Sequence, residues 1–156
     1  MNATPYAKDV ASDIIARHDA RPEMLVQILH EFIEHFSWIS EDAMRQLAEE
    51  LNLSRADVHG VVSFYHDFRT APPGKRVVKI CQAEACQAMG STELAAHAES
   101  VLGIKMHESS EELTLEPVYC LGNCACSPSV MVDDAIYGRV DPDRFSALVD
   151  TTKERD

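Results

Sequence analysis

Residues 77–86, VVKICQAEAC, and residues 113–124, LTLEPVYCLGNC, each pass from an apolar run into a pair of cysteines. Runs rich in β-branched residues predict strands, so each cysteine pair follows a strand. If the two strands are parallel neighbours, both cysteine loops emerge at one edge of the sheet. Folding then gathers four thiolates, which is the ligand set of iron–sulfur clusters and of tetrahedral zinc.

The spacing of the cysteines favours one of these two centres. Zinc sites most often use two cysteines separated by two residues, whose tight turn points both sulfurs at one ion. Here four residues separate Cys81 from Cys86, and three separate Cys120 from Cys124. These longer loops suit a wider centre, so the spacing predicts a [2Fe–2S] electron carrier. A zinc-stabilised scaffold stays open as the alternative, whereas the absence of Cys-x-x-Cys disfavours a thiol–disulfide oxidoreductase.

The pattern of apolar residues changes in the middle of the chain. Residues 1–72 predict a helical domain, because apolar side chains recur there at helical spacing. The sequence TAPPG at 70–74 then breaks the helical pattern. Residues 73–156 predict a strand, a helix, a strand, a hairpin and a helix. We therefore expect an α+β fold with two domains, 1–72 and 73–156.

Short polar residues mark the expected ends of the helices. Ser40 and Ser54 are predicted to cap two helices of the first domain, and Asp57 completes a capping box with Ser54. Ser91 is predicted to cap the helix of the second domain, and Gly103 to end it. Asp-Asp at 133–134 is predicted to form the hairpin turn.

The bulk composition excludes several classes of function. A formal net charge of −12 argues against nucleic acid and against anionic membrane surfaces. The first twenty residues lack the apolar run of a signal peptide, and no stretch is apolar enough for a membrane span. These features predict a cytoplasmic protein, where grouped cysteines more often bind metal than form disulfides.

No motif for catalysis is found in the sequence. A nucleophile elbow, a phosphate loop and Gly-x-Gly-x-x-Gly are all absent, and no histidine pairs with the cysteines at ligand spacing. We therefore expect no catalytic residue in this chain. Its predicted chemistry is the electron transfer of the cluster that the four cysteines would hold.

Several motifs together resemble the 24-kDa subunit family of NADH:quinone oxidoreductase. Glu-Glu-Leu at 49–51, Val-His-Gly-Val at 58–61 and the aromatic residues at 64, 65 and 68 are similar to its helical arm. Residues 79–86 and 120–128 resemble its cluster motifs. The resemblance implies a thioredoxin-like ferredoxin domain with one [2Fe–2S] cluster, docked on a flavoprotein that binds FMN and NAD. It also implies four cluster ligands: Cys81, Cys86, Cys120 and Cys124.

The first cysteine loop, CQAEACQ at 81–87, is most similar to the gamma subunit of soluble NAD-dependent formate dehydrogenases. The equivalent subunits of respiratory complex I and of NAD-reducing hydrogenases are the alternatives. Cys126 and Ser127 depart from many relatives, and a fifth thiol here raises a second hypothesis, in which Cys126 replaces Cys124 as ligand. We expect Gly122 to turn the backbone so that amide N–H groups point at sulfur, although an ordinary turn would equally use glycine.

Overall fold

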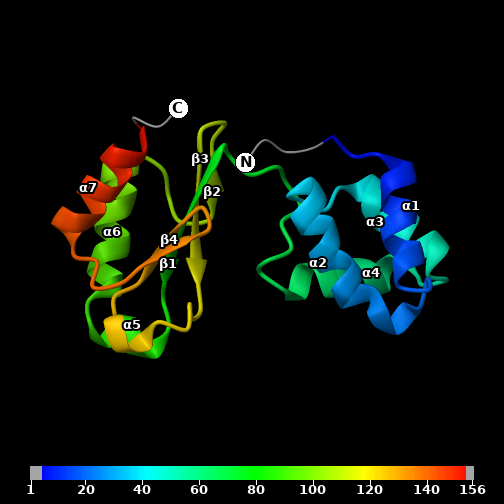
Figure 1. Cartoon of the computed structure of the whole chain (residues 1–156), viewed down its shortest axis with the longest axis horizontal. Coiled ribbons are helices and arrows are strands. Elements are labelled where there is room, and N and C mark those ends of the chain that lie inside the picture. The colour runs from blue at the N-terminus through cyan, green and yellow to red at the C-terminus, as the bar shows by residue number, and fades with distance from the viewer. Residues whose placement is uncertain (1–4, 154–156) are drawn as a thin grey trace. The chain divides into compact units, whose positions relative to one another are not determined.

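A computed structural model describes residues 5–153 of the chain. The chain divides into two compact units, the first reaching Pro73 and the second beginning at Gly74. We call them the helical unit and the sheet unit (Figure 1). Within residues 5–153, none of the helices has the length and apolarity that a membrane crossing requires.

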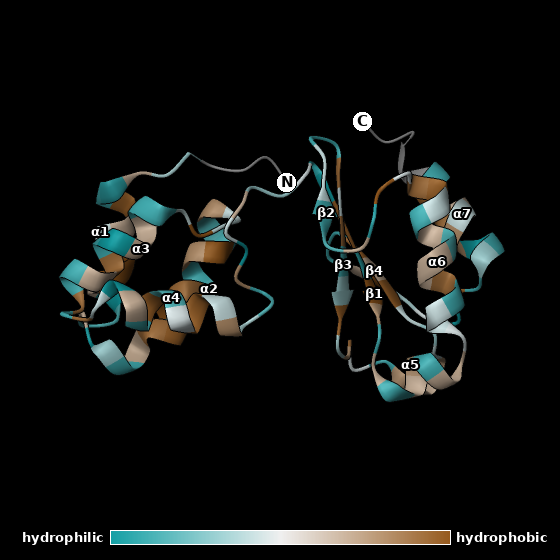
Figure 2. Ribbon diagram, turned by 180° about the vertical axis from the view of Figure 1, so that it is seen from behind, coloured by the Kyte–Doolittle hydropathy of each residue, from teal (hydrophilic) through white to brown (hydrophobic). Residues whose placement is uncertain are grey.

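The helical unit is built from four α-helices around one apolar core. They are α1 (Lys8–Arg17), α2 (Leu25–Phe36, after the 3-10 turn η1, Pro22–Met24), α3 (Glu41–Glu50) and α4 (Arg55–Phe64). Figure 2 shows the apolar stripes of the helices turned toward one another. Side chains from all four helices are buried there, among them Ile14, Ile15, Ile28, Phe32, Leu47 and Val58.

The predicted caps of this unit are confirmed. The Ser40 hydroxyl accepts a hydrogen bond from the Ala43 N–H at 3.0 Å. Ser54 and Asp57 form the full capping box: the Asp57 N–H donates to the Ser54 hydroxyl, and the Ser54 N–H donates to the Asp57 carboxylate. These bonds satisfy N–H groups that a helix leaves unpaired at its start.

The sheet unit contains one five-stranded sheet in the order β2-β3-β1-β4-β5. Its elements are β1 (Arg76–Cys81), α5 (Glu84–Ala88), α6 (Ser91–Leu102), β2 (Glu108–Ser109), β3 (Leu113–Val118), η2 (Cys124–Cys126), β4 (Val130–Val132), β5 (Ala135–Tyr137) and α7 (Pro142–Lys153). Helices α6 and α7 lie side by side against the sheet, whereas α5 lies at its end (Figure 1). The α+β fold class is confirmed.

Strands β1 and β3 are parallel neighbours, in a register that pairs Arg76 with Leu113 and Cys81 with Val118. Both strands therefore end at the same edge, and the two cysteine loops leave the sheet together, as the sequence predicted. Gly74 fixes the start of this pairing. Its N–H donates to the Thr114 hydroxyl at 2.7 Å, and a Cβ on Gly74 would lie only 2.4 Å from the Leu113 backbone nitrogen.

The turns of this unit are partly as predicted. Gly103 ends α6 with φ +70°, and Asp133 makes the hairpin turn with φ +53°. The prediction for Ser91 is wrong. Gly90, with φ +94°, is the residue before α6, and it has no side chain that could cap the helix. Ser91 is the first helical residue, and its buried hydroxyl finds no partner in the described part of the chain. The elements α5, β2 and η2 were not predicted at all.

Candidate metal centre

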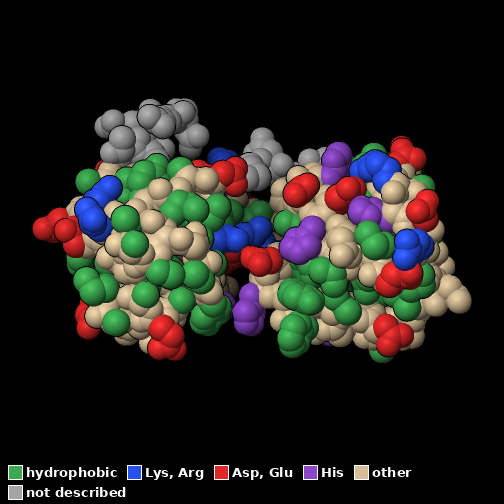
Figure 3. All heavy atoms as spheres, turned by 60° about the horizontal axis from the view of Figure 1, so that its bottom comes forward, with side chains coloured by type: hydrophobic (Ala, Val, Ile, Leu, Met, Phe, Trp, Pro, Cys, Tyr) green, Lys and Arg blue, Asp and Glu red, His purple; other side chains and the backbone are tan. Residues whose placement is uncertain are grey.

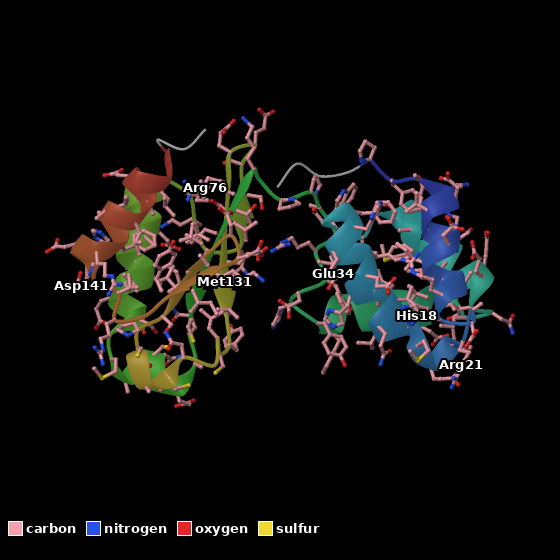
Figure 4. The ribbon with its side chains drawn as sticks, viewed as in Figure 1. His18, Arg21, Glu34, Arg76, Met131 and Asp141 are labelled. Atoms are coloured by element: carbon pink, nitrogen blue, oxygen red, sulfur yellow. The ribbon has the colours of Figure 1, made fainter. Side chains whose placement is uncertain are left out.

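Four cysteines converge at the edge of the sheet where β1 and β3 end. Cys81 is the last residue of β1 and Cys86 lies in α5, and each is only 2% exposed. Cys120 and Cys124 follow β3 and are exposed. Figure 4 shows several sulfur atoms beside α5. One half of this cysteine set is thus embedded in the fold, and the other half faces outward.

The sulfurs are arranged as two pairs. The Sγ atoms of Cys120 and Cys124 lie 3.6 Å apart, and the thiols of Cys81 and Cys86 contact each other. The charges of Cys81 and Cys86 also act on Cys124, so the two pairs are neighbours. Two sulfurs on one tetrahedral metal, each about 2.3 Å from it, lie about 3.8 Å apart. The Cys120 and Cys124 pair matches this spacing, and four thiols in two pairs suit a centre with two metal ions and two thiolates on each, as in a [2Fe–2S] cluster.

Within residues 5–153, no group of three or more His, Cys, Asp or Glu side chains surrounds one ion position. All five cysteines are free thiols.

The two embedded thiols differ in acidity. Burial raises the pKa of the Cys81 thiol, and the neighbouring Cys86 raises it further, against the N–H groups of Ala83 and Leu121 that hydrogen-bond to its sulfur. Burial also acts to raise the pKa of Cys86, but its hydrogen-bond interactions with Ser127, Cys81 and Ser129 outweigh it and lower that pKa. Cys86 is therefore the embedded thiol with more hydrogen-bond donors around its thiolate.

In the exposed pair, Cys124 holds its proton more tightly than an ordinary thiol. The pKa of the Cys124 thiol is raised by its hydrogen bond with Cys120 and by the charge of that neighbour. Two thiolates this close repel each other until a cation lies between them. A metal ion would provide that charge, which couples its binding to loss of the thiol protons.

Gly122 gives the second cysteine loop its shape. Its φ of +71° is a left-handed conformation that favours glycine, and its N–H donates to the Cys120 sulfur at 3.3 Å. The expectation that this glycine aims an amide at sulfur is confirmed. Cys120 itself has φ +118°, a conformation that non-glycine residues keep only when their surroundings hold them in place.

Cys126 is held by the hairpin. Its N–H donates to the Asn123 carbonyl at 2.9 Å, and its own carbonyl accepts from the Arg139 N–H at 2.6 Å. A Cβ added at Gly138 would lie 2.7 Å from the Cys126 Cβ, so this cysteine packs closely against the end of β5. The contacts of Cys126 thus tie it to the segment after β5.

Ser127 and Ser129 belong to the site, although no local pattern in the sequence points to either role. The Sγ atom of Cys86 lies 3.4 Å from the Ser127 hydroxyl oxygen, between residues 41 positions apart in the chain. The N–H and the hydroxyl of Ser129 both lower the pKa of the same thiol. Contacts at such a separation depend on the fold, so local spacing does not reveal them.

The surface around the cysteine loops is largely apolar. Residues 117–132 contain no charged side chain, although the whole chain has a formal net charge of −12. Met89 and Tyr119 are 63% and 59% exposed. Figure 3 shows hydrophobic side chains spread over the face of the sheet unit that carries this edge. Glu84 is an exposed acid in the first cysteine loop.

A family model described as thioredoxin-like [2Fe-2S] ferredoxin matches residues 11–153. The chain therefore belongs to the thioredoxin-like [2Fe-2S] ferredoxin family, and one [2Fe–2S] cluster is its cofactor. The family confirms the predicted fold and cofactor, and it favours the cluster over the zinc-stabilised scaffold.

Curated relatives belong to larger oxidoreductases. An NADH-quinone oxidoreductase subunit of Pseudomonas aeruginosa is 31% identical over 115 residues, which cover 72% of this chain and 69% of the relative. The same subunit of Buchnera aphidicola is 29% identical over 130 residues, covering 82% and 76%. The HndA subunit of the NADP-reducing hydrogenase of Solidesulfovibrio fructosivorans is 28% identical over 127 residues, covering 80% and 74%.

A solved structure shares the fold. The crystal structure of an NAD+-reducing [NiFe]-hydrogenase in the air-oxidized state superposes with a TM-score of 0.69 at 20% sequence identity. The match covers 85% of this chain but only 23% of the hydrogenase chain. At this identity the likeness concerns the fold alone.

Proposed function

We propose that this chain is the electron-transfer subunit of an NAD-linked dehydrogenase, and that Cys81, Cys86, Cys120 and Cys124 hold its [2Fe–2S] cluster. The observation that carries the ligand assignment is the pairing of the four sulfurs, with 3.6 Å between those of Cys120 and Cys124. Cys126 stays outside the proposed ligand set, because the thiols that act on the pKa of Cys124 are those of Cys120, Cys86 and Cys81, whereas Cys126 makes backbone bonds to Asn123 and Arg139. When bound, the cluster accepts and donates one electron at a time.

The residues around the cysteines prepare the site for such a cluster. Backbone N–H groups of Ala83, Leu121 and Gly122 point at sulfur and stabilise thiolate charge. The fold excludes water from Cys81 and Cys86, while the outer pair stays exposed. An electron would therefore enter or leave on the Cys120 and Cys124 side, where a partner can approach.

The proposed partner is a flavoprotein subunit that binds FMN and NAD. The relatives named above are subunits of NADH-quinone oxidoreductases and of an NADP-reducing hydrogenase. The segment 117–132 carries no charged side chain, which suits a lasting contact with another subunit. The chain has no catalytic role of its own in this proposal, and it acts in the cytoplasm, where its thiols stay reduced.

We favour a formate dehydrogenase as the complex, because the first cysteine loop resembles the gamma subunit of the soluble NAD-dependent enzymes. Complex I and NAD-reducing hydrogenase are the second candidates, and the curated relatives favour them.

We further propose that residues 1–72 and 73–156 are separate domains, the first an arm for the complex and the second the cluster carrier.

Purification of the tagged chain from its own cells, without oxygen, tests the complex. We expect a copurifying subunit that contains FMN, and formate-dependent reduction of NAD by the purified complex. Activity with hydrogen or NADH-dependent quinone reduction in place of formate would assign the chain to one of the second candidates. A chain that purifies with no flavoprotein would contradict the proposal.

A further inference from the structure

The sulfur of Cys86 lies among serine groups from a distant loop. Ser127 and Ser129 flank Pro128, just after the second cysteine loop. The Ser127 hydroxyl oxygen lies 3.4 Å from the Cys86 Sγ, and the N–H and hydroxyl of Ser129 both lower the pKa of that thiol. Cys86 is 2% exposed and Ser129 is 1% exposed. Water therefore has little access, and these groups supply the polar environment of the sulfur.

The proton of the Ser127 hydroxyl has two possible acceptors. In the structure it is donated to the Cys124 carbonyl oxygen at 2.8 Å, while the Cys86 thiol donates to the Ser127 oxygen. A metal-bound Cys86 has no proton to donate. The serine oxygen would then face a thiolate with a lone pair, unless the hydroxyl turns and donates to sulfur. The thiolate is the stronger acceptor because it carries charge.

Asn123 leaves the Ser129 proton available to sulfur. The Asn123 side-chain amide donates to the Ser129 oxygen at 3.2 Å. The two carbonyls within reach of the Ser129 hydroxyl, on Asn123 and Cys126, are at 3.4 and 3.5 Å, which makes them weak competitors. The amide thus fills the accepting side of Ser129, and the hydroxyl proton can turn to Cys86.

We propose that Ser127 and Ser129 are positioning residues that donate O–H···S hydrogen bonds to Cys86 and raise the reduction potential of the cluster. The reason is electrostatic. Reduction adds one negative charge, and donors on sulfur stabilise the reduced state more than the oxidised state. Four thiolates with few positive residues nearby would otherwise give a low potential. This inference rests on the proposed function, because it requires Cys86 to be a cluster ligand.

The test is a redox titration of the purified full-length chain, followed by electron paramagnetic resonance of the reduced cluster. We expect Ser127→Ala and Ser129→Ala each to shift the midpoint potential to more negative values. Ser127→Thr keeps a hydroxyl and should stay near the wild-type potential. Ser146→Ala is the matched control, because its hydroxyl bonds His97 on α6 rather than a cysteine, and it should not shift the potential.

The outcomes separate this inference from the function on which it rests. A wild-type chain without a two-iron signal would contradict the proposed function itself. A wild-type cluster whose potential is unchanged in both alanine variants would overturn only the role of the serines. A negative shift in Ser127→Ala that Ser127→Thr does not reverse would also overturn it, since the effect would then not come from the hydroxyl. If Ser127→Ala does not retain iron, an unchanged potential in Ser129→Ala decides against the inference.

Discussion

Replacement of Gly138 by alanine would press a methyl group into the second cysteine loop. Gly138 follows β5, and a Cβ there would lie 2.6 Å from the Asn123 Nδ2, 2.7 Å from the Cys126 Cβ and 2.8 Å from the Cys126 carbonyl oxygen. Carbon atoms in contact normally lie about 3.5–4.0 Å apart, so the loop must retreat by close to an ångström. The Cys126 carbonyl cannot move freely, because it accepts the Arg139 N–H at 2.6 Å.

The size of the effect follows from these contacts. Overpacking of this kind destabilises a fold by about 1–3 kcal/mol. If the Asn123 side chain swings away, its hydrogen bond to Ser129 is lost, which adds about 1 kcal/mol. Alanine also makes the unfolded chain less flexible than glycine does. This effect stabilises the fold by about 0.4–1 kcal/mol and offsets part of the loss. We therefore expect Gly138→Ala to lower the free energy of unfolding by about 1–3 kcal/mol.

Urea unfolding of the full-length chain measures this change, and iron content measures its effect on the site. Gly60→Ala is the control, because a Cβ on Gly60, inside α4, would meet nothing within 4 Å. Alanine there should stabilise the helix by up to about 1 kcal/mol. A Gly138→Ala variant with wild-type stability and full iron content would refute the reasoning. It would show that the second cysteine loop can move to make room for the methyl group without a change in the free energy of unfolding.

Three further predictions concern other parts of the chain. Ser54→Ala removes the capping box of α4 and should lower the free energy of unfolding by about 1 kcal/mol in urea, whereas Ser63→Ala, on the exposed side of the same helix, should change it little. Burial, with smaller contributions from Asp42 and Glu50, raises the pKa of Tyr6 to about 12 from 10.0. Neutral Tyr6 therefore stabilises the fold fully below pH 10, and this contribution is lost as the pH rises through 12. Urea midpoints across that range should fall less steeply for Tyr6→Phe, and equal slopes would contradict this prediction. Cys126→Ser should keep the visible absorption and iron of the wild type, whereas Cys124→Ser should lose both; the opposite result would assign Cys126 as the ligand.

The sequence predicted those features that depend on neighbours along the chain. Capping by Ser40 and Ser54 and the stop at Gly103 follow from side-chain chemistry within one helical turn. The meeting of both cysteine loops followed from two strands that end in cysteine, once they pair in parallel. The order of the predicted elements in the sheet unit, a strand, a helix, a strand, a hairpin and a helix, was correct for the same reason, because each has its own periodic pattern.

Features set by tertiary contacts were missed. Ser91 looks like a cap in sequence, but Gly90 takes a left-handed conformation and moves Ser91 into the helix, where its hydroxyl is buried. Helix α5 spans only Glu84–Ala88, too short for a period to be recognised. The contact between Cys86 and Ser127 spans 41 residues of sequence, and Ser129, which also acts on Cys86, lies in the same loop. Only the folded loop places these hydroxyls at the sulfur.

The central claim is that Cys81, Cys86, Cys120 and Cys124 hold one [2Fe–2S] cluster. Electron paramagnetic resonance of the anaerobically purified chain after dithionite reduction tests it most directly, with iron and acid-labile sulfide measured on the same sample. The account predicts a spin-one-half signal and two atoms each of iron and sulfide per chain. A colourless chain with one stoichiometric zinc and no such signal would contradict it.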